Sequence, residues 1–81
     1  MKNRISVIGI VVKNRKESAS LINKIISDFG DIVIGRMGIP YRERNLSVIS
    51  LIVDGDNDQI GALTGKLGQI NGVKVRSIIA Y

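Results

Sequence analysis

Residues 56–75, DNDQIGALTGKLGQINGVKV, decide the fold, because they predict a capped helix, a turn and a strand in succession. Asp56 is a typical N-cap residue, and Gln59 three positions later completes a capping-box pattern. Apolar residues then recur at helical spacing, at Ile60, Leu63, Leu67 and Ile70. Asn71-Gly72 ends the predicted helix, and the alternating residues that follow predict a strand.

A second stripe of the same predicted helix consists of Gly61, Gly65 and Gly68, which lie roughly opposite the leucines. Each glycine inside a helix costs about 1 kcal/mol relative to alanine. Either another backbone or a ligand comes close to this stripe, or the packing of the apolar stripe outweighs the poor helix propensity. We therefore take the three glycines as candidate interface residues.

The chain on both sides of this stretch predicts the remaining elements. Arg4–Val12 is rich in β-branched residues and predicts a strand, and Asn14 with Glu17 predicts the start of a helix that Gly30 closes. Two more strands are expected at residues 31–40 and 46–53, and the last strand at Val73–Ile79. The order β-α-β-β-α-β predicts an α+β fold, the ferredoxin-like two-layer sandwich. In that fold both helices cover one face of a four-stranded antiparallel sheet.

The predicted central strands, Arg4–Val12 and residues 46–53, are apolar on both faces. Two helices can cover only one face, so the other face needs a partner. We expect the partner to be the same chain, in a homo-oligomer that is a dimer or a tetramer. The candidate interface residues on these strands are Ile8 and Ile10, one of which we expect on the open face.

Composition narrows the function classes. The chain has 81 residues, which predicts a single domain over residues 1–81. It contains no Cys and no His, so we expect no disulfide, no metal site, no cofactor and no enzymatic activity. Only 4% of the residues are aromatic, so the core is expected to be aliphatic. The N-terminal apolar run is too short for a membrane span and lacks a signal-peptide cleavage site, which predicts a cytoplasmic protein.

The net charge of +5 favours anionic ligands or partners without identifying one. Lys13, Asn14 and Arg15 lie at the turn into the first predicted helix, and Arg36 lies between two glycines of the second strand. Helix N-termini and arginine side chains attract anions, so these four residues are the candidate ligand-binding residues. The alternative is a solvated basic surface. Nucleic-acid binding is disfavoured, because the predicted sheet offers no aromatic residues on which bases could stack.

Residues 36–53, RMGIPYRERNLSVISLIV, and residues 57–77, NDQIGALTGKLGQINGVKVRS, resemble a small bacterial family of regulators of the iron-only hydrogenase system. Its members look like free-standing ACT-type domains, related in fold to the regulatory domain of the nickel-responsive repressor. The resemblance implies an ACT-like domain. That repressor binds nickel through His and Cys, which this chain lacks, so its metal site is not implied here. The glycine that amino-acid-binding ACT domains carry near the first helix is also missing.

The resulting hypothesis is a regulatory or sensing module that binds a small metabolite or a protein partner and regulates transcription in the iron-only hydrogenase system. The alternative is a structural adaptor that assembles with other proteins and has no ligand. A nucleic-acid-binding protein is a third class, which rests on the basic charge alone.

Overall fold

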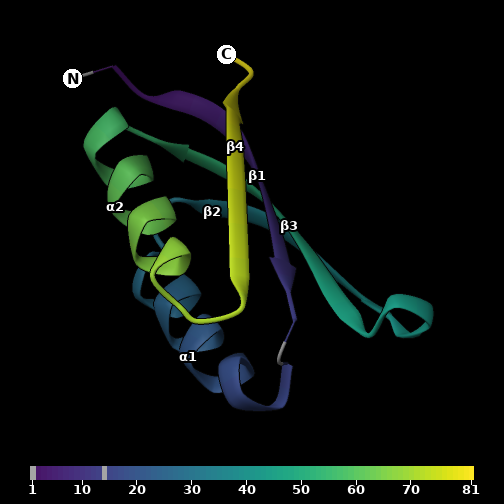
Figure 1. The fold of residues 1–81 in the computed structure, drawn as a ribbon. Coiled ribbons are helices and arrows are strands. Elements are labelled where there is room, and N and C mark those ends of the chain that lie inside the picture. Colours follow the sequence, from purple (N-terminus) through teal and green to yellow (C-terminus); the bar gives the residue numbers. More distant parts are fainter. Residues whose placement is uncertain (1, 14) are drawn as a thin grey trace.

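The computed structural model describes residues 2–13 and 15–81 and confirms the predicted order of elements (Figure 1). Four antiparallel strands form one sheet in the order β2-β3-β1-β4, and both helices lie on the same side of it (Figure 1). The fold is the ferredoxin-like two-layer sandwich. The elements are β1 (Arg4–Val12), α1 (Arg15–Asp28), β2 (Val33–Tyr41), the 3₁₀ helix η1 (Arg42–Arg44), β3 (Leu46–Gly55), α2 (Asn57–Gly68) and β4 (Val73–Ile79).

The capping box that begins α2 is present as the sequence predicts. The backbone N–H of Gln59 donates a hydrogen bond of 2.8 Å to Oδ1 of Asp56, and the N–H of Asp56 donates one of 3.0 Å to Oε1 of Gln59. These two bonds satisfy N–H groups that a helix start leaves without partners. The corresponding box expected at Asn14 and Glu17 lies outside the described residues, because Asn14 belongs to the undescribed part of the chain.

Several element boundaries differ from the prediction for local reasons. Helix α2 ends at Gly68 rather than near Ile70, because the N–H of Ile70 closes a tighter turn onto the carbonyl of Leu67. Strand β3 continues to Gly55 instead of ending before Asp54. A Cβ at Gly55 would lie 3.0 Å from Oε1 of Gln59 and 3.1 Å from Cγ2 of Ile32, so a glycine suits this crowded position.

The core lies between the sheet and the helices and is aliphatic, as the composition predicts. It is built from the inward side chains of β1 and β3 and from the apolar stripes of the two helices. The fully enclosed apolar members are Ile8, Ile10, Val12, Ile22, Leu51, Val53, Leu63 and Leu67.

The expectation that Ile8 or Ile10 lies on the open face is wrong. Side chains alternate along a strand, so these two residues, separated by one position, point to the same face. That face is the one the helices cover, and both side chains have no exposed surface. Within one chain they are core residues and cannot contact a partner.

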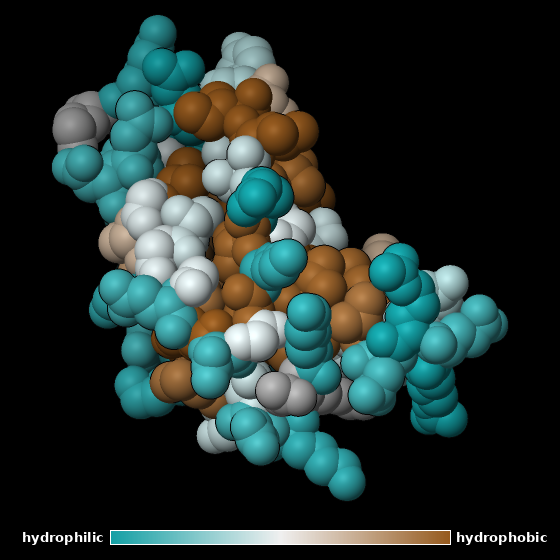
Figure 2. Space-filling view, viewed as in Figure 1, coloured by the Kyte–Doolittle hydropathy of each residue, from teal (hydrophilic) through white to brown (hydrophobic). Residues whose placement is uncertain are grey.

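The opposite face of the sheet carries no helix, and we call it the open face. Its residues are the alternate positions of the four strands, and many of them are large and apolar. The exposed ones are Val7, Met37, Ile39, Tyr41, Val48, Ile52 and Ile78. Figure 2 shows hydrophobic surface that runs from the C-terminal end of β4 toward the β2–β3 hairpin.

Candidate functional site

The surface between the first turn of α1 and the β2–β3 hairpin is hollowed into an open groove of about 660 Å³. We call it the α1–hairpin groove. A narrower extension of about 190 Å³ continues beneath α1 and adds Asn23 and Arg36 to the lining. The wider part is lined by Lys13, Lys16, Glu17, Ala19, Pro40, Arg42, Asn45, Leu46 and Ser47.

The groove exists because the hairpin reaches beyond the helix that covers it, as Figure 1 shows. The long axis of the molecule measures 41 Å, while the other two measure 19 and 16 Å. Where helix and hairpin approach each other, the facing residues are compact: Ala19 on α1, and Gly38 and Pro40 on β2. Small side chains at these positions leave space that a larger pair would fill.

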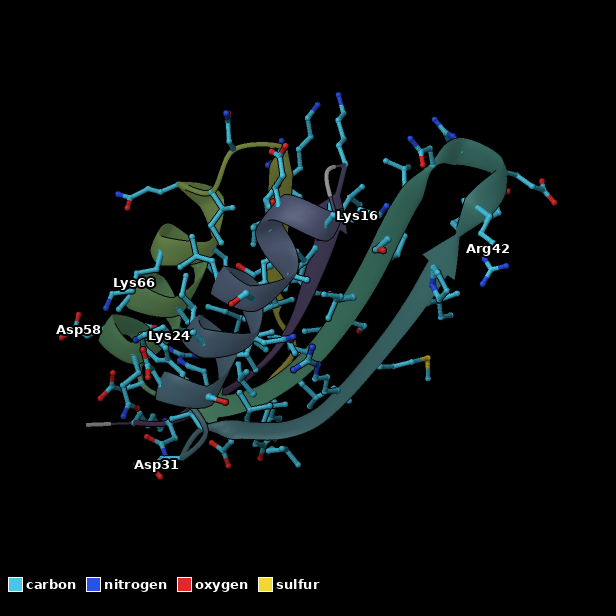
Figure 3. All side chains as sticks on the ribbon, turned by 90° about the horizontal axis from the view of Figure 1, so that it is seen from below. Lys16, Lys24, Asp31, Arg42, Asp58 and Lys66 are labelled. Atoms are coloured by element: carbon cyan, nitrogen blue, oxygen red, sulfur yellow. The ribbon has the colours of Figure 1, made fainter. Side chains whose placement is uncertain are left out.

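Positive charge dominates the wider part of the groove. Lys16 comes from the start of α1 and Arg42 from the hairpin tip, and Figure 3 shows them on opposite sides of the groove. Lys13 adds a third positive charge and Glu17 a single negative one. The ion pair that the described residues form joins Nζ of Lys24 to Oδ2 of Asp28 at 3.2 Å. It involves none of the residues that line the groove. The three cations are therefore available to an anion.

Ser47 is the polar residue at the floor of the groove. It belongs to the inward face of β3, is only 9% exposed, and lines both the wider part and the extension. No group in residues 2–13 and 15–81 forms a hydrogen bond with its hydroxyl. Because this hydroxyl opens onto the groove, it is free to donate or accept a hydrogen bond with a molecule bound there.

Two of the four ligand-binding residues that the sequence predicts line this groove. Lys13 lies in the wider part and Arg36 in the extension beneath α1. The guanidinium of Arg36 donates a hydrogen bond to Oδ1 of Asn23, which links β2 to α1. Asn14 and the side chain of Arg15 lie outside the described part of the chain. The structure thus brings Lys13 and Arg36 to one groove.

The sequence placed Lys16 in the same basic turn as Lys13, but it did not join Arg42 and Ser47 to that turn. Lys16 and Arg42 are 26 positions apart, and only the fold brings α1 and the hairpin tip together. Ser47 had a detectable signal, since it is the polar residue among the inward positions Ile49, Leu51 and Val53 of a predicted strand. A lone hydroxyl on an otherwise aliphatic face indicates a special environment.

The glycine stripe of α2 faces outward. A Cβ built at Gly61, Gly65 or Gly68 would meet nothing within 4 Å, so no other part of the described chain approaches this stripe closely. Together with β4 the stripe lines a shallow, open depression of about 610 Å³. Its predicted role as an interface between chains remains a prediction.

Residues 2–13 and 15–81 contain no group of three or more Asp or Glu side chains placed to hold a metal ion. In the same residues, no helix is both long enough and apolar enough to cross a membrane.

The sheet order and the two helices on one face form the ferredoxin-like arrangement that ACT domains share. The ACT domain from GTP pyrophosphokinase of Chlorobium tepidum superposes with a TM-score of 0.78, covering 95% of this chain and 100% of that one at 20% identity. A formyltetrahydrofolate deformylase from Pseudomonas putida KT2440 matches 95% of this chain with 29% of its own, with a TM-score of 0.67 and 8% identity. These similarities establish the fold.

A nearer relative is the uncharacterized protein TM1266 from Thermotoga maritima, which is 39% identical. Its structure covers 99% of this chain and 100% of its own, with a TM-score of 0.94. A family model described as "TM1266-like: Iron-only hydrogenase system regulator, putative" matches residues 4–77. The chain belongs to this TM1266-like family, which confirms the resemblance noted in its sequence. A search of curated proteins found no match.

Proposed function

We propose that the protein is a regulatory module of the iron-only hydrogenase system, an oligomeric ACT-like domain that binds a small anionic metabolite in the α1–hairpin groove. The observation that carries the proposal is the convergence of Lys13, Lys16 and Arg42 on one groove that Ser47 also lines. The family and the regulatory-domain fold favour a regulator rather than an enzyme. As a regulator of transcription it acts in the cytoplasm.

The groove favours a ligand of mixed chemistry. Lysine and arginine side chains bind carboxylate or phosphate through charge-assisted hydrogen bonds. Leu46, Ala19 and Pro40 supply an apolar wall for the rest of the ligand. A volume of about 660 Å³ lies within the range of small-molecule sites, roughly 300–1,000 Å³. Asn14 and Arg15 remain candidate ligand residues on the strength of the sequence.

The assembly proposed with this function is a homo-oligomer, a dimer or a tetramer. The glycine stripe of Gly61, Gly65 and Gly68 is proposed as a secondary contact between dimers, because it is exposed and leaves room for a close approach. A regulatory protein partner is the second kind of binding partner compatible with the module.

The test is a thermal-shift screen against carboxylate and phosphate metabolites, followed by titration of any compound that raises the melting temperature. The Arg42→Ala variant removes a groove cation, and Arg44→Ala removes an equal charge from the same 3₁₀ helix outside the groove lining. Arg42→Ala is expected to weaken binding at least about tenfold, since a charge-assisted hydrogen bond contributes roughly 1.5–3 kcal/mol. Arg44→Ala is expected to bind almost unchanged.

Two results contradict the proposed site. In the first, no anion in the screen shifts the melting temperature. In the second, both arginine variants weaken binding equally, which indicates general attraction rather than a site. The first result favours the alternative function, a structural adaptor without a ligand, for which the apolar open face is the supporting observation. Salt-dependent retention on immobilised DNA or RNA would instead support a nucleic-acid binder.

A further inference from the structure

The open face carries an apolar patch to which all four strands contribute. Ile78 of β4 is 66% exposed, Met37 of β2 63%, Ile52 of β3 44% and Val7 of β1 36%. Val7 pairs with Ile52 on one side and with Ile78 on the other, so these three side chains form a continuous row across the sheet. Contiguous exposed apolar surface of this kind marks an interaction site.

The charged residues of the open face lie at its rim. Lys74 and Arg76 stand on the edge strand β4, and Asp54 stands near the end of β3. The centre holds Gly9, paired with Ser50. An apolar, uncharged centre with a polar rim is the usual anatomy of a protein–protein interface.

The size of the face suits a stable dimer. The molecule measures 41 Å and 19 Å along its two longer axes. A face of that length and width has an area on the order of the ~800 Å² that each partner buries in a standard interface. A small domain also gains much of its stability from such burial, because its own core is limited.

We propose that the open face is the interface of a two-fold homodimer, covered by the open face of a second copy. A sheet face is nearly flat, and a second identical sheet packs on it about 10 Å away, as in a β-sandwich. The same patch then serves both subunits, which is the requirement of a two-fold interface. This assembly does not depend on the ligand proposed for the α1–hairpin groove.

The charges on β4 select the direction of the two-fold axis. An axis running across the strands through the row of Met37, Ser50, Gly9 and Arg76 sets each strand over its own copy and Arg76 over Arg76, which is unfavourable. An axis running along the strands between β1 and β3 sets β4 over β2. Arg76 then faces Met37 of the second copy, and Val7 faces Ile52. The structure therefore favours the axis along the strands.

A matched pair of lysine substitutions tests the face. Ile52→Lys places a charge in the apolar row, and Leu21→Lys places one on α1, where the side chain is 47% exposed. Both positions are exposed within one chain, so both variants are expected to fold, as circular dichroism will verify. By light scattering, Ile52→Lys is expected to halve the mass of the unmodified protein, while Leu21→Lys leaves the mass unchanged. An undiminished mass for Ile52→Lys would overturn the assignment of this face.

Single cysteines test the same face without adding charge, because the chain has no cysteine of its own. Ser50→Cys lies beside the proposed axis and is expected to give dimers linked by a short bis-maleimide, because sheets about 10 Å apart hold the two sulfur atoms too far apart for a disulfide. Ser20→Cys, exposed on α1, is expected to remain unlinked. Equal linkage of the two variants would contradict the interface, and a monomer mass for the unmodified chain would leave the open face to a different partner.

The direction of the axis has its own test. Met37→Cys alone is expected to link poorly, since its neighbour across the interface is Arg76. The Met37→Cys, Arg76→Cys double variant is expected to link readily, and only between chains, because β2 and β4 are the opposite edges of the sheet. Efficient linkage of Met37→Cys alone would overturn the axis along the strands.

Discussion

On the helix-covered face of β1, Ile8 and Ile10 have no exposed surface, whereas Val7 on the open face of the same strand is 36% exposed. The two faces consist of the same kinds of residue and differ in what lies over them. Burying one large aliphatic side chain contributes about 1.5–3 kcal/mol, so an uncovered face of several such residues forgoes a substantial part of a domain's stability of about 5–15 kcal/mol. Hydrophobicity on both faces of a strand thus predicts two covering layers, and only one comes from this chain.

The largest expected effect separates the two faces directly. Ile10→Lys buries a charge in the core and is expected to unfold the domain, with a loss of about 5 kcal/mol or more. Ile52→Lys on the open face is expected to keep the folded structure. Thermal melts followed by circular dichroism compare the two variants. A cooperative melt for Ile10→Lys near that of the unmodified protein would mean that the two faces are wrongly assigned.

A smaller effect concerns the layer that covers the inner face. Asp56→Ala removes the cap of α2 and is expected to cost about 1 kcal/mol, or roughly 4–8 °C in melting temperature. Asp58→Ala removes the same charge from the first turn of α2 without breaking the capping box. If the two variants melt at the same temperature, the loss is due to charge and not to capping.

The smallest expected effect concerns the glycine stripe on the exposed side of α2. Within a single chain, Gly65→Ala is expected to stabilise α2 by about 0.5–1 kcal/mol, because alanine favours a helix and an added Cβ meets nothing within 4 Å. At the proposed contact between dimers, the added methyl group would instead weaken the assembly. Gly55→Ala is the contrast, since its Cβ would crowd Ile32 and Gln59, and it is expected to destabilise the domain. Chemical denaturation measures both. Reduced stability or a smaller assembly for Gly65→Ala would indicate that the glycine stripe contacts another chain.

Much of the fold is predictable because it is encoded locally. The order of elements and the capping box at Asp56 and Gln59 both follow from short sequence patterns, and the structure contains both. The choice of covered face was not predictable in this way, because both faces of β1 are apolar. Strict alternation does place Ile8 and Ile10 on the same face of β1. The sequence itself therefore excluded the prediction that only one of the two lies on the open face.

The site was predictable only in part, for a different reason. Lys13 and Arg36 were identified from local context, next to a helix start and between glycines. The joining of Lys16 to Arg42 depends on how far the hairpin projects beyond α1, and short-range patterns do not specify that distance. Ser47 needed the inward face of β3 to be known first.

The mass of the unmodified protein in solution tests the central claim, that a second copy supplies the missing layer. Light scattering or sedimentation at micromolar concentration, without any ligand, is expected to give at least twice the 8.8 kDa of one chain. Dilution is expected to lower this mass and the melting temperature together, because the dimer stabilises the fold by mass action. A mass of one chain at micromolar concentration, with a melting temperature independent of dilution, would contradict the account.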